Sequence, residues 1–254
     1  MAQQRSLEHA PITEALIDIQ VNPSKDLSFP QFKEVIDKLD CGYYVKSSIA
    51  QGHFGFSLTP ESLQTETISQ SSHVGLRLHS QDEKYVAQFR LGGLTLSRLP
   101  PYENWAKLIL ETKRIWDIYE KQLLPGRVTR IATRFINDLR LPLQQGDSYQ
   151  IYLNKLVDLP NEAPQNVESF FQRFQLIDSE SDARVNLTLA LDMTPPSGPS
   201  PVILDIDAFM LTDLAPTDKR IWEFLDALRQ LKNKTFFGTI TEKAAELYEA
   251  ELYE

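Results

Sequence analysis

The pattern of apolar and polar positions is clearest between residues 94 and 139. Alternation at 94–99 predicts a strand, which stops at two prolines. Apolar residues then recur every three or four positions from 105 to 123, the spacing of a helix with one buried face. A proline and a glycine follow, and alternation resumes at 127–141, which predicts a long strand. This unit of strand, long helix and long strand is the best-specified part of the chain.

Shorter patterns ahead of this unit predict one helix and several strands. Ser28 lies three positions before Gln31, so a capping box marks the start of the helix. Two of the strands are expected to form a hairpin about Gln51 and Gly52, with a polar loop at 62–72 behind it. The strands expected ahead of the long helix are at 14–21, 43–50, 53–58, 73–80, 84–91 and 94–99.

The second part of the chain is predicted to begin with the long strand and to continue with a short helix from Ser148. Thr217 is expected to cap a second long helix, and Thr239 is expected to cap a last helix because Glu242 follows three positions later. The further strands expected between these helices are at 167–177, 184–193 and 201–211.

The order of elements recurs along the chain. The first part reads strand, helix, strands and long helix, and the second reads long strand, helix, three strands and long helix, with one helix added. We therefore expect an α+β fold of two similar halves, 1–124 and 125–254, which form two domains or one compact domain. Each half would be an antiparallel sheet with helices packed on one face.

Two junctions also resemble one another in sequence, LSRLPPYENWAKL at 96–108 and LTDLAPTDKRIWEFL at 211–225. Both pass from a strand through a proline-bearing turn to a helix led by tryptophan, which favours an internal duplication. A chance match is the alternative, because the similar stretch is short and repeats of this size have no fixed period. Two such sheets joined under two long helices would resemble the saddle of TATA-binding-protein-like folds, an analogy that carries no function.

Composition places the chain among soluble globular proteins, with 42% hydrophobic and 24% charged residues over 254 positions. The formal net charge of −9 argues against broad nucleic-acid binding, which depends on Lys and Arg neutralising phosphates. The single cysteine, Cys41, permits no internal disulfide and indicates a reducing compartment. No signal core and no run of about 20 apolar residues is present, so we expect a cytoplasmic protein that does not enter a membrane.

Two pairs of charged residues are the leading candidates for a ligand site. Arg130 and Arg134 share one face of the long strand, and Asp205 and Asp207 share one face of a later strand. Guanidinium groups suit an anion, and paired carboxylates suit a divalent cation. The structural alternative is that the two pairs offset one another across a single antiparallel sheet with both charged faces turned the same way. We favour it, because buried charges seldom persist unpaired.

A second candidate surface lies where the long helix begins. Trp105 is on the apolar stripe of that helix and is expected to be almost fully buried. Together with Tyr102 it would otherwise mark a contact surface for a partner protein. The sequence carries no GxSxG, Walker, GxGxxG or HExxH pattern and no ligand spacing for a metal. We therefore assign no catalytic residue, no cofactor and no metal.

Five motifs together resemble a known protein family. They are LEHAPITEALIDI, SRLPPYENW, RIATRFIND, VILDIDAF and FFGTIT, which span nearly the full chain. They are similar to a sporadically distributed bacterial family of roughly this length whose function is uncharacterised. The resemblance implies a bacterial origin. Scattered distribution further implies an accessory role, such as that of a partner in a toxin, defence or mobile-element locus.

Two classes of function remain, and the sequence leaves open whether the chain is an enzyme. The preferred one is a non-catalytic interaction protein, an adaptor, inhibitor or immunity or antitoxin-like partner whose acidic surface meets a more basic protein. The alternative is an anion- or metal-binding protein or hydrolase that uses the Arg and Asp pairs. Nucleic-acid binding on a saddle fits the fold analogy but not the net charge. The pattern predicts no oligomeric state.

Overall fold

The computed structural model describes residues 1–23, 27–56, 67–143, 147–154, 162, 164, 167, 169–191 and 201–249, with the backbone alone at 52–56 and 67–71. Within them the chain forms one nine-stranded antiparallel sheet and four α-helices. The strands are β1 (Ile12–Val21), β2 (Tyr43–Phe56), β3 (Thr67–Ser80), β4 (Tyr85–Arg90), β5 (Gly93–Arg98), β6 (Val128–Leu139), β7 (Phe170–Ile177), β8 (Arg184–Leu191) and β9 (Val202–Leu214). The helices are α1 (Phe29–Asp37), α2 (Trp105–Leu123), α3 (Arg220–Thr239) and α4 (Glu242–Glu246), with a 3-10 turn η1 (Tyr149–Ile151).

One sheet runs through both expected halves of the chain, in the order β2-β3-β4-β5-β1-β6-β9-β8-β7. The halves meet where β1 pairs with β6, and Ile17 there lies opposite Thr133. The α+β class and the antiparallel sheet are thus confirmed. Strands that are far apart in sequence share one ladder of backbone hydrogen bonds, so the two halves also share one core.

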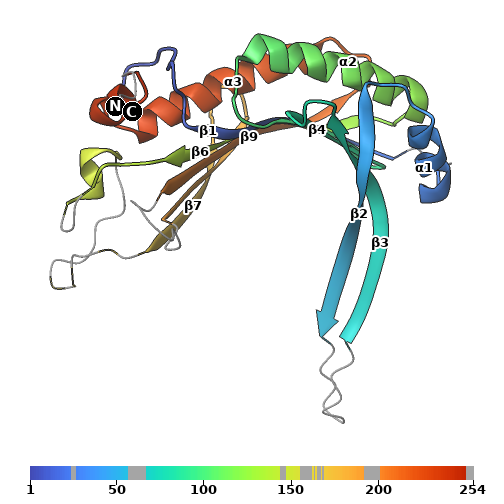
Figure 1. The fold of residues 1–254 in the computed structure, drawn as a ribbon, viewed down its shortest axis with the longest axis horizontal. Coiled ribbons are helices and arrows are strands. Elements are labelled where there is room, and N and C mark those ends of the chain that lie inside the picture. The colour runs from blue at the N-terminus through green and yellow to red at the C-terminus, as the bar shows by residue number, and fades with distance from the viewer. Residues whose placement is uncertain are drawn as a thin grey trace.

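The long helices α2 and α3 cover one face of the sheet, and the sheet bends away from them at both ends (Figure 1). Alternation along β1 explains which face is covered. Ala15, Ile17 and Ile19 are fully buried on the helix side, and Asp18 between them points to the other side. Among the described residues no α-helix covers that second, concave face (Figure 1).

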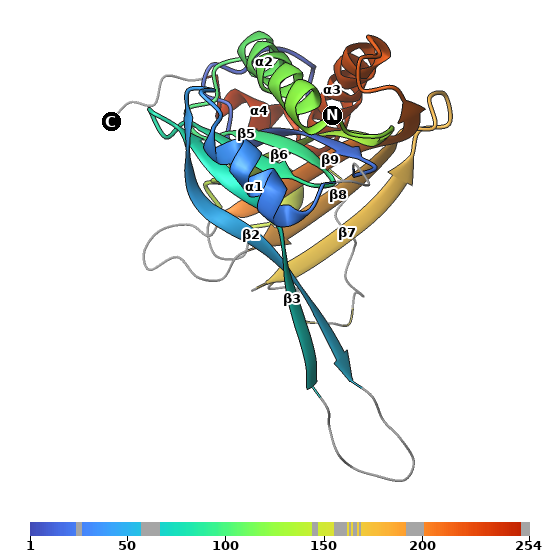
Figure 2. The same cartoon turned by 90° about the vertical axis from the view of Figure 1, so that its right-hand side faces the viewer.

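The hairpin of β2 and β3 is longer than the sequence pattern predicts. Instead of a turn at Gln51 and Gly52, these residues pair with Ser72 and Ser71 in the middle of a ladder between two 14-residue strands. The expected polar loop at 62–72 therefore lies partly within β3. Backbone pairing does not need apolar side chains, so polar residues continue both strands, and the hairpin projects beyond the rest of the described chain (Figure 2).

Two predicted helix caps are wrong. The backbone N–H of Arg220 donates to Asp218, 2.9 Å away, so α3 begins after Asp218 without a cap from Thr217. Thr239 is the last residue of α3, where its hydroxyl donates to a carbonyl one turn back, and Thr241 caps α4. Sequence preference indicates which residue types can cap a helix. Where two such residues lie close together, the backbone conformation around them determines which one forms the cap.

Other expectations hold in part. The capping box of α1 is present, with the Ser28 backbone N–H donating to Gln31. The helix expected from Ser148 is the single turn η1, and its later part at 155–160 lies outside the described residues. In the part of the chain that the structure describes, no helix is both long enough and apolar enough to cross a membrane.

Trp105 connects the two long helices. It is 7% exposed, which confirms the predicted burial, and its Nε1 donates to Asp226 of α3 at 2.6 Å. We expect Trp105→Ala to lower the free energy of unfolding by roughly 3–5 kcal/mol, since it leaves a cavity and breaks this contact. Leu110→Ala on the same helix is the control, because Leu110 is largely exposed and its loss should change little. Urea unfolding curves that do not separate the two variants would contradict the burial argument.

Candidate functional site

The predicted Arg and Asp pairs meet on the concave face of the sheet. β6 and β9 are antiparallel neighbours, with Arg134 directly opposite Asp207. Arg130 lies 2.8 Å from Asp207, and Arg134 lies 2.6 Å from Asp205. The prediction that both charged faces turn the same way within one sheet is confirmed.

Asp18 of β1 is the residue on which this cluster converges. Its carboxylate accepts hydrogen bonds from Arg90, from Arg130 at 3.0 Å, from Thr95 at 2.6 Å and from Gln20 at 3.0 Å. It is only 7% exposed, so these donors replace the water that it has lost. The sequence reading did not single out Asp18. The available signal is a charged residue between two isoleucines, at the third position of LIDIQ.

A shallow pocket of about 220 Å³ opens above the cluster and is lined by Leu16, Asp18, Gln88, Thr95, Arg130, Arg134 and Asp207. The charged side chains that line it form ion pairs with side chains of opposite charge. Hydrogen bonding to Asp205 raises the pKa of Arg134 above its ordinary value, so Arg134 is charged there. No group of three His, Cys, Asp or Glu side chains suited to a metal ion is present among the described residues. The arrangement therefore favours mutual pairing over ligand capture.

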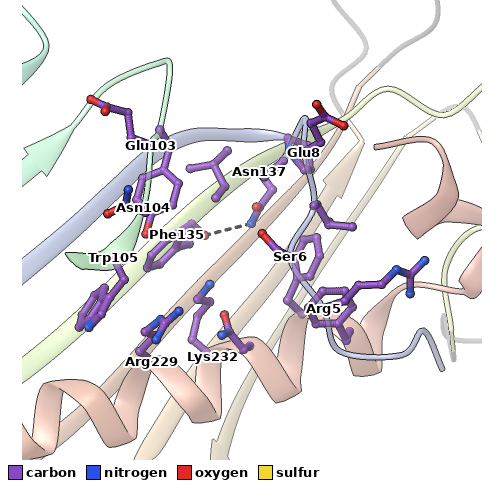
Figure 3. Close-up of a pocket in the computed structure, with 18 residues that line it drawn as sticks. Arg5, Ser6, Glu8, Glu103, Asn104, Trp105, Phe135, Asn137, Arg229 and Lys232 are labelled. Atoms are coloured by element: carbon purple, nitrogen blue, oxygen red, sulfur yellow. Dashed lines mark hydrogen bonds between the residues drawn. The ribbon is translucent and has the colours of Figure 1, made fainter. Parts of the chain in front are cut away.

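The second predicted pair lies on the opposite, helix-covered side of the sheet. Tyr102 and Trp105 line a pocket of about 200 Å³ between the N-terminal segment, the start of α2, and α3 (Figure 3). The Tyr102 ring packs edge-on against Phe135, and burial raises the pKa of Tyr102 to about 12. A contact between these two residues and a partner protein stays a prediction.

Lys232 is a residue of this pocket that the sequence reading missed. The buried face of α3 runs through Ile221, Leu225 and Leu228, and the next position on it is Lys232, only 8% exposed. Burial, with a smaller contribution from Arg229, lowers the pKa of Lys232 to about 7. A lysine at a core position of an amphipathic stripe is a sequence signal for such a site.

β2 and β7 are the two edge strands of the sheet, and the β7 edge is a third feature. β7 is the last strand in the sheet, and among the described strands it pairs only with β8. Four of its large apolar side chains are between 39% and 70% exposed: Phe171, Phe174, Leu176 and Ile177. Natural proteins usually shield such edges with charges or a covering segment. An apolar edge strand that no other described strand covers is therefore able to pair with a further strand.

Comparison with known proteins identifies no family for this chain. A scan against protein-family models found no match, and a search of curated proteins found no significant match. The three sites are consequently interpreted from their geometry.

Asp18→Asn tests the concave cluster. We expect it to lower the free energy of unfolding by about 2–4 kcal/mol, because Arg90 and Arg130 lose their shared counter-charge in a partly buried place. The control is Asp213→Asn. Asp213 pairs with Arg127 where both side chains are exposed to solvent, so this pair should contribute little to the free energy of unfolding. If denaturant titrations show the same loss of free energy of unfolding for both variants, Asp18 is not central to the cluster.

Lys232→Met tests the burial of the lysine. The unfolded chain holds a proton on this group below pH 10.5 and the folded chain only below about pH 7. Wild-type stability should therefore rise with pH between these values, and the variant should lack that rise. At pH 7 the variant should be more stable by roughly 3–5 kcal/mol, and the difference should vanish near pH 10.5. Lys234→Met, at an exposed position of the same helix, is the matched control. A gain independent of pH would contradict the argument.

Proposed function

We propose that this chain is a non-catalytic interaction protein that binds a partner protein along β7. The observation that carries the proposal is the exposed apolar side chains of that strand, whose outer edge no described strand covers. An extended partner segment can continue the sheet there, with backbone hydrogen bonds giving affinity and alternate side chains giving specificity. Phe171 and Ile177 would contact the partner on the concave side, and Phe174 and Leu176 on the other side.

The charged residues near β7 indicate which kind of partner segment would fit there. Arg173 of β7 and Arg184 of β8 lie on the concave side with Phe171 and Ile177. Neither arginine has an ion-pair partner among the described residues. β7 itself, FFQRFQLI, contains no acidic residue, so pairing with a second copy of β7 would not supply the missing counter-charge. A partner segment with alternating apolar and acidic residues would supply it.

We further propose that the two halves arose by duplication and together form a saddle like that of TATA-binding-protein-like folds. The strand order supports this. Outward from the β1 and β6 junction, one side runs β5, β4, β3 and the other runs β9, β8, β7, and a long helix follows both β5 and β9. By this correspondence β7 matches β3. The outer edge of β3 is covered by β2, whereas no described strand covers β7, and the partner would occupy that position.

The alternative function, an anion- or metal-binding protein or hydrolase, would use the cluster of Arg130, Arg134, Asp205 and Asp207. It has less support, because these side chains already neutralise one another. The resemblance to a sporadically distributed bacterial family supports an adaptor, inhibitor or immunity-type role, with the partner encoded in the same accessory or defence locus.

Affinity purification of the tagged full chain from its native host, followed by mass spectrometry, would identify the partner. We expect Phe171→Ser with Ile177→Ser, and separately Arg173→Glu, to weaken the purified complex by about tenfold or more, since each removes a central contact. Leu110→Ser, which alters an exposed apolar residue on the helix side, should leave the affinity unchanged.

Three results would overturn the proposal. In the first, the β7 variants bind the partner as tightly as the wild type does. In the second, light scattering shows that the wild type is a dimer and that the β7 variants are monomers. In the third, the protein has a metal-dependent activity that the double substitution Asp205→Asn and Asp207→Asn abolishes. The second would make another copy of the chain the occupant of the edge, and the third would favour the alternative function.

A further inference from the structure

The pocket beneath the long helices contains two cations without counter-charges. Arg229 and Lys232 lie one turn apart on α3, and both side chains project into the pocket (Figure 3). Among the described residues no carboxylate lies within ion-pair distance of either. Lys232 is more than nine-tenths buried and makes no hydrogen bond within the described chain. An unpaired buried ammonium group is costly, which points to a ligand that completes the site.

The carboxylates around the pocket are all engaged or turned away. Glu103 pairs with Arg98 at 3.1 Å and with Lys107, and Asp226 accepts the hydrogen bond of Trp105. The Glu8 carboxylate points out of the pocket (Figure 3). The cation at the outer rim, Arg5, is neutralised by Glu242 and by Glu249. The net charge facing the interior therefore comes from Arg229 and Lys232.

The residues that line the pocket indicate which kind of ligand would fit it. One part of the wall is aromatic, formed by Tyr102, Trp105, Phe135, Phe236 and Phe237, and polar side chains such as Asn104, Asn137 and Asn233 form much of the rest. The Lys232 Nζ lies 3.7 Å from the centre of the Phe135 ring, and the Arg229 guanidinium lies 5.8 Å from the Trp105 ring. A cavity of about 200 Å³ is smaller than the roughly 300–1,000 Å³ of pockets for drug-sized molecules. The space suits one ring or a short chain.

We propose that this pocket binds a small organic carboxylate with an apolar body, and that Lys232 and Arg229 hold its carboxylate group. This site goes beyond the proposed partner binding. It lies on the helix-covered side of the sheet, whereas β7 is at the sheet's edge, so either proposal can fail without the other.

Ligand binding should be coupled to proton uptake by Lys232. In the empty pocket burial and Arg229 favour the neutral amine, and a bound carboxylate would favour the ammonium form. The other titratable groups that face Lys232 do not compensate for this charge, because Tyr102 is neutral at such pH values and Glu103 is paired. The affinity should consequently fall as pH rises above the pKa of the free lysine.

Calorimetric titration of the full chain with benzoate, 4-hydroxybenzoate and hexanoate tests the proposal, with benzamide and hexanamide as uncharged controls. At least one carboxylate should bind about tenfold or more tightly than its amide at pH 7, because the amide leaves both cations unpaired. Lys232→Met should abolish that preference and Arg229→Gln should weaken it. Lys234→Met, an exposed lysine on the same helix, should bind as the wild type does.

Proton uptake provides a second readout. Titrations at pH 8 in two buffers of different ionisation enthalpy should show uptake of about one proton per carboxylate bound, and Lys232→Met should show none. Three outcomes would overturn the proposal. In the first, none of the three carboxylates binds. In the second, the carboxylates and their amides bind equally tightly. In the third, the Lys232→Met protein is folded, as thermal unfolding shows, and binds the carboxylates as tightly as the wild type does.

Discussion

The pairing of β1 with β6 is the contact on which the rest of the structure depends. It joins strands more than a hundred positions apart and places the two parts of the chain in one sheet. The ion pair from Asp18 to Arg130 crosses this junction on the concave side, and Ile17, Ile19 and Ile131 pack behind it on the helix side. α2 packs on β5 and β1, and α3 packs on β9 and β6, so the junction of β1 with β6 brings the two helix-covered surfaces together.

The two sides of the sheet handle buried charge differently. On the concave side, acidic and basic residues of neighbouring strands face one another and form ion pairs. On the helix side, Lys232 occupies a core position of α3, and no carboxylate of the described residues lies within ion-pair distance of it. In the first arrangement each charged side chain faces one of opposite charge. The second costs stability, and that cost is the reason to assign the lysine a role outside folding.

Net charge is a poor guide to the surfaces of this molecule. The chain carries −9 overall, yet the concave side near β7 presents Arg173 and Arg184, which have no ion-pair partner in the described part of the chain. Formal charge sums over residues that point in all directions, whereas binding depends on those that share one face. The partner proposed for β7 is therefore acidic, although the net charge of the whole chain favours a basic one.

By itself the sequence determined the elements whose signal is local. Periodicity placed the long helix, most strands, the burial of Trp105 and the shared faces of the Arg and Asp pairs, because side-chain direction follows from spacing alone. Only the tertiary structure decided the single sheet, the length of the β2 and β3 hairpin, the central place of Asp18, the surroundings of Lys232 and the free edge of β7. These depend on contacts between distant residues, such as Asp18 and Arg130, 112 positions apart. No local pattern specifies which strands become neighbours, since many registers bury a similar apolar face.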